Sequence, residues 1–552
     1  MSKPLKNLIV LIVLLIIVNI FSYHFYKRFD FTSDGRFTIS SVSENLIDSI
    51  KSPLSITVFL KGDLNGEFKR LQRETRFILE EFNAKNPQIR FEFINPVAGK
   101  DNPQQVGNAF YQNGMMPENL SVMKNGKLTK TLIFPWAVVK YKDQQMAVHL
   151  LNKKLNASVE SMINSSVQNL EYAFTDVFLK LSRERKKKIA VLRSKGELED
   201  RYLTDFLSHI RAYYLIAPFS LDSVQGHPKK VLKELQKFDA IIEAKPTKAF
   251  TEKELYVLDQ YIMNGGKALW MVETVAIEKD SLKQTGSNIA MPKDLNLLNL
   301  FFKYGVRINY ELINDVYSAP IYLATGKAND TQLNPYPWFY EPLAKPSANH
   351  PIVSNINAVK FEFANSLDTL KNGISKTVLL QSSEMSRAED VPREINLNMI
   401  NVKPSPEMYP KGKFPLAVLL EGEFTSVFKN RIPPFDYKKA KDKSVKTKQI
   451  VVSDGDIVKN EISKGEVLNL GFDRFTGDTY GNKTFLTNAL NYLLGDENLV
   501  KLRNKQINIP TLNSEKILNH TKLWQILNIG VGIVLIVGFG FVMYWYRLKR
   551  FR

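Results

Sequence analysis

Two uninterrupted apolar stretches lie near the two ends of the chain. No residue from Leu8 to Tyr26 carries a full charge, and the same holds from Leu523 to Tyr546. Each stretch is long enough to cross a bilayer as a helix, which needs about 20 apolar residues. No small-residue cleavage site follows the first stretch, so we expect an uncleaved anchor there rather than a signal peptide. The sequence therefore predicts two membrane spans.

The residues that flank these spans indicate how the chain is oriented. The tail before the first span carries Lys3 and Lys6, the tail after the second carries four basic residues, and neither tail contains an acid. Short basic tails usually stay in the cytoplasm. We therefore expect both termini in the cytoplasm and residues from about 27 to 522 outside it. The residues expected to anchor the spans at the membrane interface are Lys6, Lys27, Trp524, Trp545 and Arg547.

Between the spans, the pattern in residues 29–155 predicts a small α/β domain. Leu54 to Leu60 has the composition of a strand, Glu67 to Lys85 places its apolar residues on one helix face, and Ile89 to Phe93 alternates. These three segments predict a β-α-β unit, and Asn125-Gly126 predicts a hairpin turn further on. Residues 157–182 carry a long apolar stripe, typical of domain packing, and we assign residues 156–185 to a connecting helix.

Residues 186–495 show a different and more regular pattern. Short apolar strands alternate with helices from Lys188 to Val272, which is typical of a doubly wound parallel sheet. One of these helices has capping-box spacing at Thr251 and Glu254 and ends at Gly265-Gly266. Prolines after residue 310 predict long irregular insertions before the last strands and a final helix. The remaining segments are a first tail and span (1–28), a linker (496–522) and a second span with its basic tail (523–552).

Composition removes several classes of chemistry. The chain has no cysteine, which excludes thiol nucleophiles, disulfides, iron–sulfur clusters and thiolate zinc sites. Its six histidines lack the spacing of a metal-binding motif, and neither a phosphate-binding loop nor a serine-hydrolase elbow is present. We therefore predict a protein that is not an enzyme and that has no catalytic residue, cofactor or metal site.

Charged residues at two predicted strand ends are the candidates for a ligand or partner surface. Asp454 and Asp456 follow one strand, and Asp473 and Arg474 follow another. The first pair fits an acidic turn better than a cation site, and the second pair fits a structural ion pair between or around the two residues better than a catalytic role.

The net charge of +19 is only partly a signal of membrane orientation, because six of the basic residues lie in the two tails. The densest basic run, Arg183 to Lys188, fits a solvated helix end. Its location outside the cytoplasm argues against nucleic acid as a partner, whereas lipid headgroups stay open.

Several segments, spread over nearly the whole chain, resemble the GldG family of gliding-motility-associated ABC transporter proteins. The matching segments are Asp30 to Ser40, Asp239 to Glu273, Leu420 to Phe428, Ser453 to Asn460 and Leu470 to Arg474. No segment is specific alone, and the resemblance rests on their order together with the two predicted spans.

The resemblance implies a non-catalytic auxiliary subunit in the inner membrane, with a periplasmic domain of the kind called substrate-binding. Its expected partners are an ABC permease, cytoplasmic ATPase subunits and other envelope proteins of gliding motility. The large domain also resembles the glutamine-amidotransferase-like α/β fold, whose enzymes need a cysteine that this chain lacks. Two other functions stay open: a structural scaffold without transport, and a membrane-tethered hydrolase that uses Asp454 and Asp456.

Overall fold

The computed structural model describes residues 11–16, 18–19, 38–100, 102–124, 127–153, 155, 157–182, 187–325, 332–410, 412–496, 502 and 519–550. The chain divides into two compact units, Met1–Gln506 and Ile507–Arg552. The first unit contains two main sheets with their helices, together with several two- and three-stranded sheets, and the second contains one long helix.

The smaller sheet has four strands in the order β2-β1-β5-β6. β1 (Leu54–Val58) pairs in parallel with β2 (Ile89–Phe93), and α3 (Gly66–Lys85) connects them, so the predicted β-α-β unit is confirmed. β5 (Trp136–Tyr141) pairs antiparallel with both β1 and β6 (Gln144–His149). β3 (Glu118–Lys124) and β4 (Lys127–Ile133) form an antiparallel ribbon, whose predicted turn at Asn125-Gly126 lies outside the described residues.

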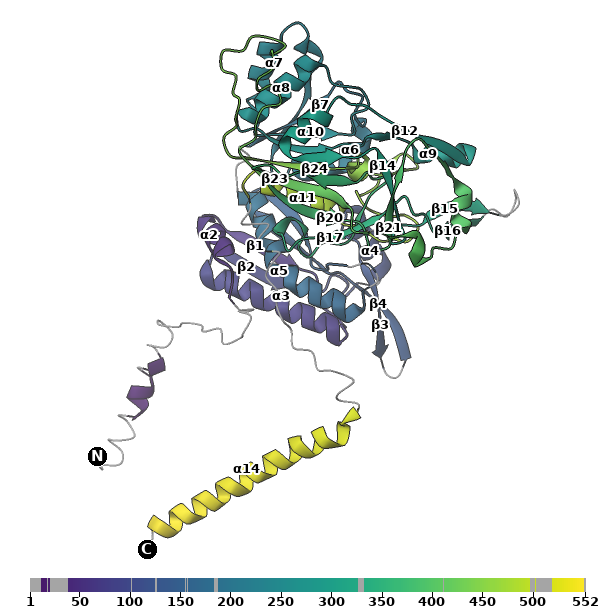
Figure 1. Ribbon diagram of the computed structural model, residues 1–552. Helices are drawn as coiled ribbons and strands as arrows, with labels where there is room; N and C mark the ends of the chain where they lie inside the picture. Colours follow the sequence, from purple (N-terminus) through teal and green to yellow (C-terminus); the bar gives the residue numbers. More distant parts are fainter. Residues whose placement is uncertain are drawn as a thin grey trace. The chain divides into compact units, whose positions relative to one another are not determined.

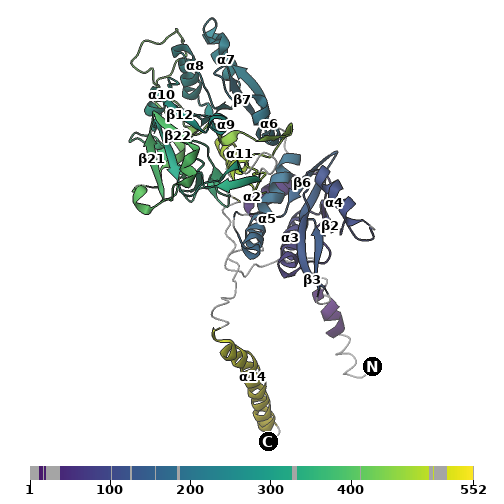
Figure 2. The same ribbon diagram turned by 90° about the vertical axis from the view of Figure 1, so that its right-hand side faces the viewer.

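The helix expected to connect the two sheets contributes to the core of the smaller one. α5 (Val159–Ser182) packs on α3, where Phe82 contacts Phe174 and Phe178 edge to face. Figures 1 and 2 show α3 and α5 side by side along this sheet. α2 (Ser41–Ser49) joins them through Ser43, whose hydroxyl donates to Glu171 at 2.7 Å. α4 (Pro103–Gln112) packs Phe110 against Phe59 and Phe134.

The larger sheet has nine strands in the order β18-β17-β20-β23-β24-β10-β9-β7-β8. Its five strands from β24 to β8 are parallel, and the others pair antiparallel. The bounds are β7 (Lys188–Arg193), β8 (Leu215–Ser220), β9 (Ala240–Ala244), β10 (Lys267–Met271), β17 (Leu343–Pro346), β18 (Val359–Lys360), β20 (Ser375–Gln381), β23 (Pro415–Gly422) and β24 (Thr447–Val452).

Helices cover both faces of this sheet, as the strand and helix alternation predicts. α6 (Asp200–Ile210) and α11 (Asn482–Leu493) pack on one face, and α7 (Pro228–Leu235), α8 (Glu252–Met263) and α10 (Leu298–Tyr304) pack on the other. All five residues of β9 are consequently buried.

The predicted capping box of α8 is confirmed, because Thr251 and Glu254 make both of its reciprocal hydrogen bonds. Two glycines end this helix, Gly265 at a φ of 95° and Gly266, where a Cβ would lie 2.3 Å from the ring of Tyr261.

The insertions expected to be irregular contain many short paired elements around a core that includes Trp338, Tyr340 and Phe363. The elements from residue 222 to 467 outside the nine-stranded sheet and its helices are η1 (Asp222–Val224), β11 (Val275–Ala276), α9 (Lys279–Thr285), β12 (Ser287–Pro292), β13 (Val306–Ile308), β14 (Glu311–Asp315), β15 (Ile321–Thr325), β16 (Gln332–Tyr336), η2 (Pro351–Val353), β19 (Leu367–Thr369), β21 (Ser386–Asp390), β22 (Arg393–Asn396), η3 (Leu397–Asn401), η4 (Pro406–Met408), η5 (Asp456–Val458), β25 (Ile462–Ser463) and β26 (Glu466–Val467).

The second unit contains α14 (Thr521–Arg550), which is long and apolar enough to cross a membrane. It carries three of the expected interface residues, Trp524, Trp545 and Arg547. Among the described residues it is the one helix that meets this test. The two remaining interface residues, Lys6 and Lys27, lie outside the described residues, as does most of the first apolar stretch. The two-span topology therefore stays a prediction.

Candidate functional site

Charged side chains gather where three central strands of the nine-stranded sheet end. Lys245 follows β9, Glu273 lies two residues after β10, and Asp454 and Asp456 follow β24. These strands are parallel neighbours, so their carboxyl ends meet at one edge of the sheet. Such edges are the common ligand-binding positions of open α/β sheets. We call Lys245, Glu273, Asp454 and Asp456 the inner cluster.

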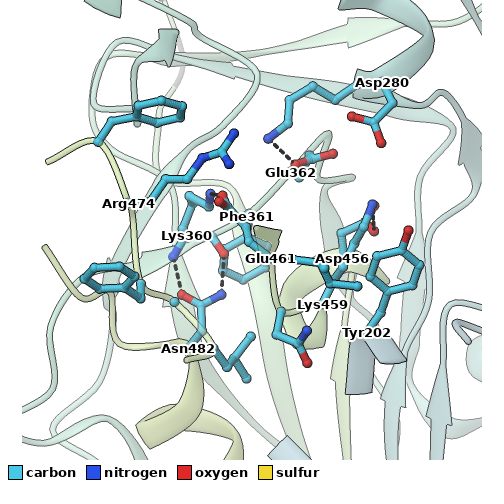
Figure 3. A pocket seen from close by; sticks show the side chains of 17 residues that line it. Tyr202, Asp280, Lys360, Phe361, Glu362, Asp456, Lys459, Glu461, Arg474 and Asn482 are labelled. Atoms are coloured by element: carbon cyan, nitrogen blue, oxygen red, sulfur yellow. Dashed lines mark hydrogen bonds and ion pairs between the residues drawn. The ribbon is translucent and has the colours of Figure 1, made fainter. Parts of the chain in front are cut away.

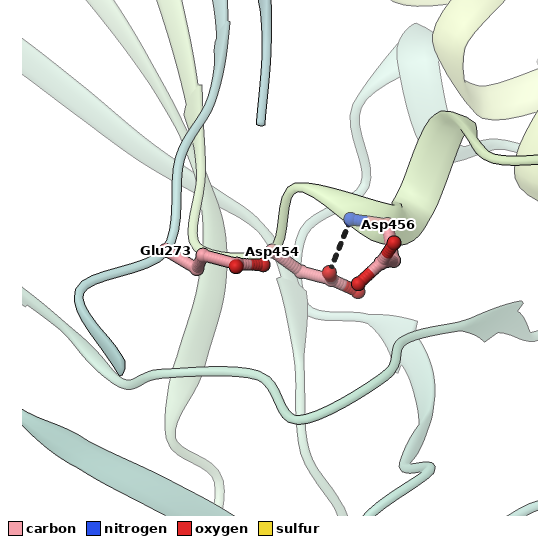
Figure 4. A group of neighbouring side chains, drawn as sticks. All are labelled: Glu273, Asp454 and Asp456. Carbon is pink, nitrogen blue, oxygen red and sulfur yellow. Dashed lines mark hydrogen bonds between the residues drawn. The ribbon is translucent and has the colours of Figure 1, made fainter. Parts of the chain in front are cut away.

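The three acids of the inner cluster each offer a carboxylate oxygen, and these oxygens lie within 4.8 Å of one another (Figure 4). Oxygen donors of this kind suit a hard divalent cation. The Lys245 ammonium, however, already lies among the acids, 2.5 Å from Asp456 Oδ2 and 3.8 Å from Glu273 Oε1. A divalent ion bound here would have to displace that ammonium group.

Further contacts complete the neutralisation of the inner cluster. Lys293 lies 2.9 Å from Glu273 Oε1, and Lys459 lies 3.4 Å from Asp456 Oδ1. The Lys245 backbone has a φ of 57°, and its side chain packs against Gly455, where a Cβ would lie 2.5 Å from Lys245 Cβ. Glycine at position 455 is therefore required for the close approach of these two loops.

Burial and the neighbouring charges set the protonation of this cluster. Burial raises the pKa of Asp454 well above its usual range, and the charges of Asp456 and Glu273 raise it further. Asp454 accepts backbone hydrogen bonds from Glu362 at 2.8 Å and Asp456 at 2.7 Å, which oppose this rise. Burial lowers the pKa of Lys245, but the nearby carboxylates outweigh it and hold that pKa far above its ordinary value. Lys245 therefore stays charged.

Glu243, two residues before Lys245 on β9, has a contrasting environment. Its side chain is fully buried, and neither carboxylate oxygen has a hydrogen-bond partner within the described part of the chain. Burial raises the pKa of Glu243 well above its ordinary value, and the charge of Glu197 raises it further. Burial therefore favours the neutral form of this carboxyl group in the folded protein.

A cavity of about 260 Å³ opens beside the inner cluster, and we call it the outer pocket (Figure 3). Lys279 spans part of its wall, with its ammonium 2.7 Å from Glu341 and 2.6 Å from Glu362. The charge of Lys279 holds the pKa of Glu362 well below its ordinary value against the effect of burial. The lining residues are Tyr202, Lys279, Asp280, Lys360, Phe361, Glu362, Asp456, Lys459, Asn460, Glu461, Ile462, Leu470, Gly471, Phe472, Arg474, Phe475 and Asn482.

The four residues expected at a ligand or partner surface take three different positions. Asp456 and Arg474 line the outer pocket, whereas Asp454 is fully buried behind it. Asp473 forms a turn, in which its Oδ1 accepts from the backbone of Phe475 at 2.9 Å. The ion pair expected between Asp473 and Arg474 is not formed among the residues that the structure describes, because the Arg474 guanidinium donates to Ser463 Oγ at 3.2 Å instead.

The basic run from Arg183 to Lys188 is described only at its end. Lys188 begins β7, and Lys187 donates to the backbone carbonyl of Leu494 and lies 3.8 Å from Asp496. Lys187 therefore holds two chain segments together, whereas the sequence predicted a solvated helix end.

Sequence reasoning missed several residues of the site, above all Lys245, Glu273, Lys279 and Glu362. A usable signal was present for the first two, because Lys245 and Glu273 directly follow apolar strands of a predicted parallel sheet. Lys279 and Glu362 lie outside the strands of the nine-stranded sheet, in parts of the chain where no periodic pattern indicates which segments meet.

Comparison with known families decides the class of the protein. A family model described as "ABC-type uncharacterized transport system" matches residues 186–489, more than half of the chain. The chain belongs to this family. A second family model, for a domain of unknown function, matches residues 33–140. Membership in this ABC transport family indicates an accessory role in a transport system, and α14 adds association with a membrane.

Individual relatives add little to this assignment. An uncharacterized protein of Borreliella burgdorferi is 21% identical over 435 residues, which cover 76% of this chain and 77% of the relative. Among solved structures, the mmIFT52 N-terminal domain is 15% identical, covers 56% of this chain and 97% of its own, and has a TM-score of 0.32.

Proposed function

We propose that this protein is a membrane-anchored, non-catalytic accessory subunit of an ABC transport system, with a periplasmic domain that binds a ligand or an envelope partner. The observation that carries the proposal is the family match over residues 186–489 in a chain that ends in an apolar helix of membrane-spanning length. The resemblance to the GldG family adds gliding motility as the process that this transport system serves.

The chemistry of the site supports binding rather than catalysis. The nine-stranded sheet is doubly wound, and we propose that it is of the glutamine-amidotransferase-like type, but the chain has no cysteine for the catalytic triad of those enzymes. A hydrolase that used Asp454 and Asp456 would need one of them free, whereas Asp454 is fully buried and Asp456 is paired with Lys245. The outer pocket is accessible and lies beside them.

The proposed partners are the permease and the cytoplasmic ATPase subunits, together with other motility proteins of the envelope. Both predicted spans and both basic tails are available for contact with the permease within the inner membrane and at its cytoplasmic face. Purification of the natively expressed chain from mild detergent should recover a permease and an ATPase in constant ratio. Recovery of the chain alone would contradict the proposed role.

The scaffold function makes a different prediction for the same complex. An accessory transport subunit should change the ATP hydrolysis rate when it is added to permease and ATPase in reconstituted membranes. An unchanged rate in a stable complex would favour a scaffold without transport.

The proposed topology can be tested directly because the chain has no native cysteine. Single cysteines are introduced as Lys3→Cys, Lys248→Cys and Arg552→Cys, and intact cells with a permeabilised outer membrane are treated with a membrane-impermeant maleimide. Labelling of Lys248→Cys alone is expected. Labelling of Lys3→Cys would contradict the first span.

A further inference from the structure

We propose that the outer pocket binds a small zwitterion, a molecule of amino-acid or dipeptide size that carries one carboxylate and one ammonium group. This inference rests on the proposed function insofar as the domain is taken to bind a ligand. The volume of about 260 Å³ suits a molecule of this size better than a large solute or a polymer.

The charge balance of the pocket favours a ligand without net charge. Its lining contains four cationic side chains and four carboxylates. A polyanion such as a nucleotide would meet four acidic side chains that repel it, and a polycation would meet four basic side chains that repel it. The eight residues are Lys279, Lys360, Lys459 and Arg474, with Asp280, Glu362, Asp456 and Glu461.

Most of these charges are already engaged with one another. Lys279 is paired with Glu362 at 2.6 Å, and Lys459 lies 3.4 Å from Asp456. Lys360 lies 3.7 Å from Glu341 and 3.9 Å from Glu461. Within the described ranges, Arg474 and Asp280 have no oppositely charged group within ion-pair distance. One cation and one anion of the pocket wall are therefore available to a ligand.

The positions of these two residues match a ligand with separated charges. Figure 3 shows Arg474 on one side of the pocket and Asp280 on another, with Glu362 between them. A carboxylate that binds Arg474 and an ammonium group that binds Asp280 would belong to the two ends of one molecule.

Arg474 is held in place for this role. Its guanidinium lies 4.6 Å from the ring centroid of Phe475, and that ring stacks on Tyr322 at 4.2 Å. The hydrogen bond to Ser463 fixes the group further. Planar guanidinium groups bind carboxylates with two parallel hydrogen bonds, and prior ordering lowers the entropic cost of binding.

The amide side chains of the pocket do not compete for this role. Asn482 exchanges hydrogen bonds with the backbone of Lys360 and donates to the backbone carbonyl of Ile457. Asn460 accepts from the backbone N–H of Asp205 and donates to the backbone carbonyl of Arg201. These amides hold the pocket together. Recognition consequently depends on the two charged residues, with the Tyr202 hydroxyl as a further group without a partner among the described residues.

The test uses the purified full chain in detergent and isothermal titration with alanyl-alanine and the free amino acids as probes. At least one of these zwitterions should bind. The two blocked forms of alanyl-alanine, N-acetyl-alanyl-alanine and alanyl-alaninamide, each lack one charge and should bind at least 10-fold more weakly than alanyl-alanine itself. Arg474→Gln and Asp280→Asn should each weaken binding about 10- to 100-fold, as expected for loss of a charged hydrogen-bond partner. Arg90→Gln and Asp143→Asn remove exposed charges from the small domain and should leave the affinity unchanged.

Three outcomes would overturn the inference: no probe binds at 10 mM, the blocked forms bind as well as alanyl-alanine, or the control variants lose affinity equally. Thermal melting of each variant shows that it is folded. The titration needs no partner protein, so it is independent of the co-purification with a permease and an ATPase. If no probe binds but the chain still co-purifies with them, the proposed ligand class is rejected and the accessory role is retained. Binding without co-purification would reject that role and leave the site.

Discussion

In the inner cluster, the Lys245 side chain is 4% exposed and lies among carboxylates, whereas in the outer pocket Arg474 and Asp280 are exposed and make no ion pair with the described residues. The two regions adjoin each other, and Asp456 belongs to both. They contain the same kinds of charged group at the same edge of the sheet. The two regions differ in how deeply their charged side chains are buried.

A buried charge is strongly destabilising unless a partner compensates it, so the inner cluster must neutralise itself in order for the domain to fold. An exposed charge has water as its partner and can exchange that water for a ligand. The inner cluster is therefore expected to affect stability, and the outer pocket is expected to affect binding. Five substitutions of buried and exposed titratable residues test this contrast, in order of expected effect.

The largest effect is expected for Lys245→Met, which leaves Glu273 and Asp456 without their main counter-charge. Removal of one partner from a buried ion network costs about 3–5 kcal/mol. Urea denaturation of the full chain in detergent, followed by tryptophan fluorescence, measures this loss. Lys248→Met removes an exposed lysine from the same loop and should change the free energy of unfolding by less than about 0.5 kcal/mol. Equal stabilities would show that the inner cluster has no structural role.

Glu243→Met should act in the opposite direction. Because the folded pKa of Glu243 is raised, its contribution to stability is full below the unfolded pKa and is lost as the pH rises toward the folded value. The methionine variant should therefore gain stability over the parent as the pH rises above about 4.5, by about 1–3 kcal/mol. Urea midpoints from pH 4 to pH 8 measure the gain. Glu394→Met, at an exposed position, should show no such trend.

His209 gives a smaller effect with the reverse pH dependence. Burial, with the charges of Lys180 and Lys483, lowers the pKa of His209 to about 4. The unfolded chain therefore takes up a proton that the folded chain does not, and stability is lost as the pH falls from about 6.5 to 4. His209→Gln should reduce this acid loss by about 1–2 kcal/mol, allowing for the partial exposure of the ring. An unchanged acid profile would show that the ring is solvated.

The smallest effect on stability is expected for the two residues of the outer pocket. Arg474→Gln and Asp280→Asn should each change the free energy of unfolding by less than about 0.5 kcal/mol, because neither side chain makes an ion pair within the described residues. The same urea titration measures both. A loss above about 2 kcal/mol would place these residues with the inner cluster and remove the distinction between the two regions.

Local patterns in the sequence predicted much of the fold. The β-α-β unit around α3 and the capping box of α8 depend on residues close in sequence, and both are present. The alternation from β7 to β10 predicted a parallel sheet for the same reason. The insertions were expected, but their paired strands were not, because short strands such as β13 and β14 pair with β19 and β21, which come much later in the chain.

Residues of the site were predicted only where they lie close together in the sequence. Asp454 and Asp456 lie at one strand end and were found together. The contact of Asp456 with Lys245, however, depends on the strand order β9-β10-β24, in which β24 comes much later in the chain. That Arg474 makes no ion pair with the described residues was also beyond sequence reasoning, because Asp473 forms a turn instead. The predicted domain boundaries stay predictions.

Hydrogen–deuterium exchange of the full chain, with and without the zwitterion that binds most tightly, tests the division between the two regions most directly. We expect slower exchange in residues 456–462 and 470–475, which line the outer pocket, and no change in the small sheet. The same protection should be absent in Arg474→Gln and present in Arg90→Gln. Protection that is confined to segments outside the outer pocket, or that persists in Arg474→Gln, would contradict the account.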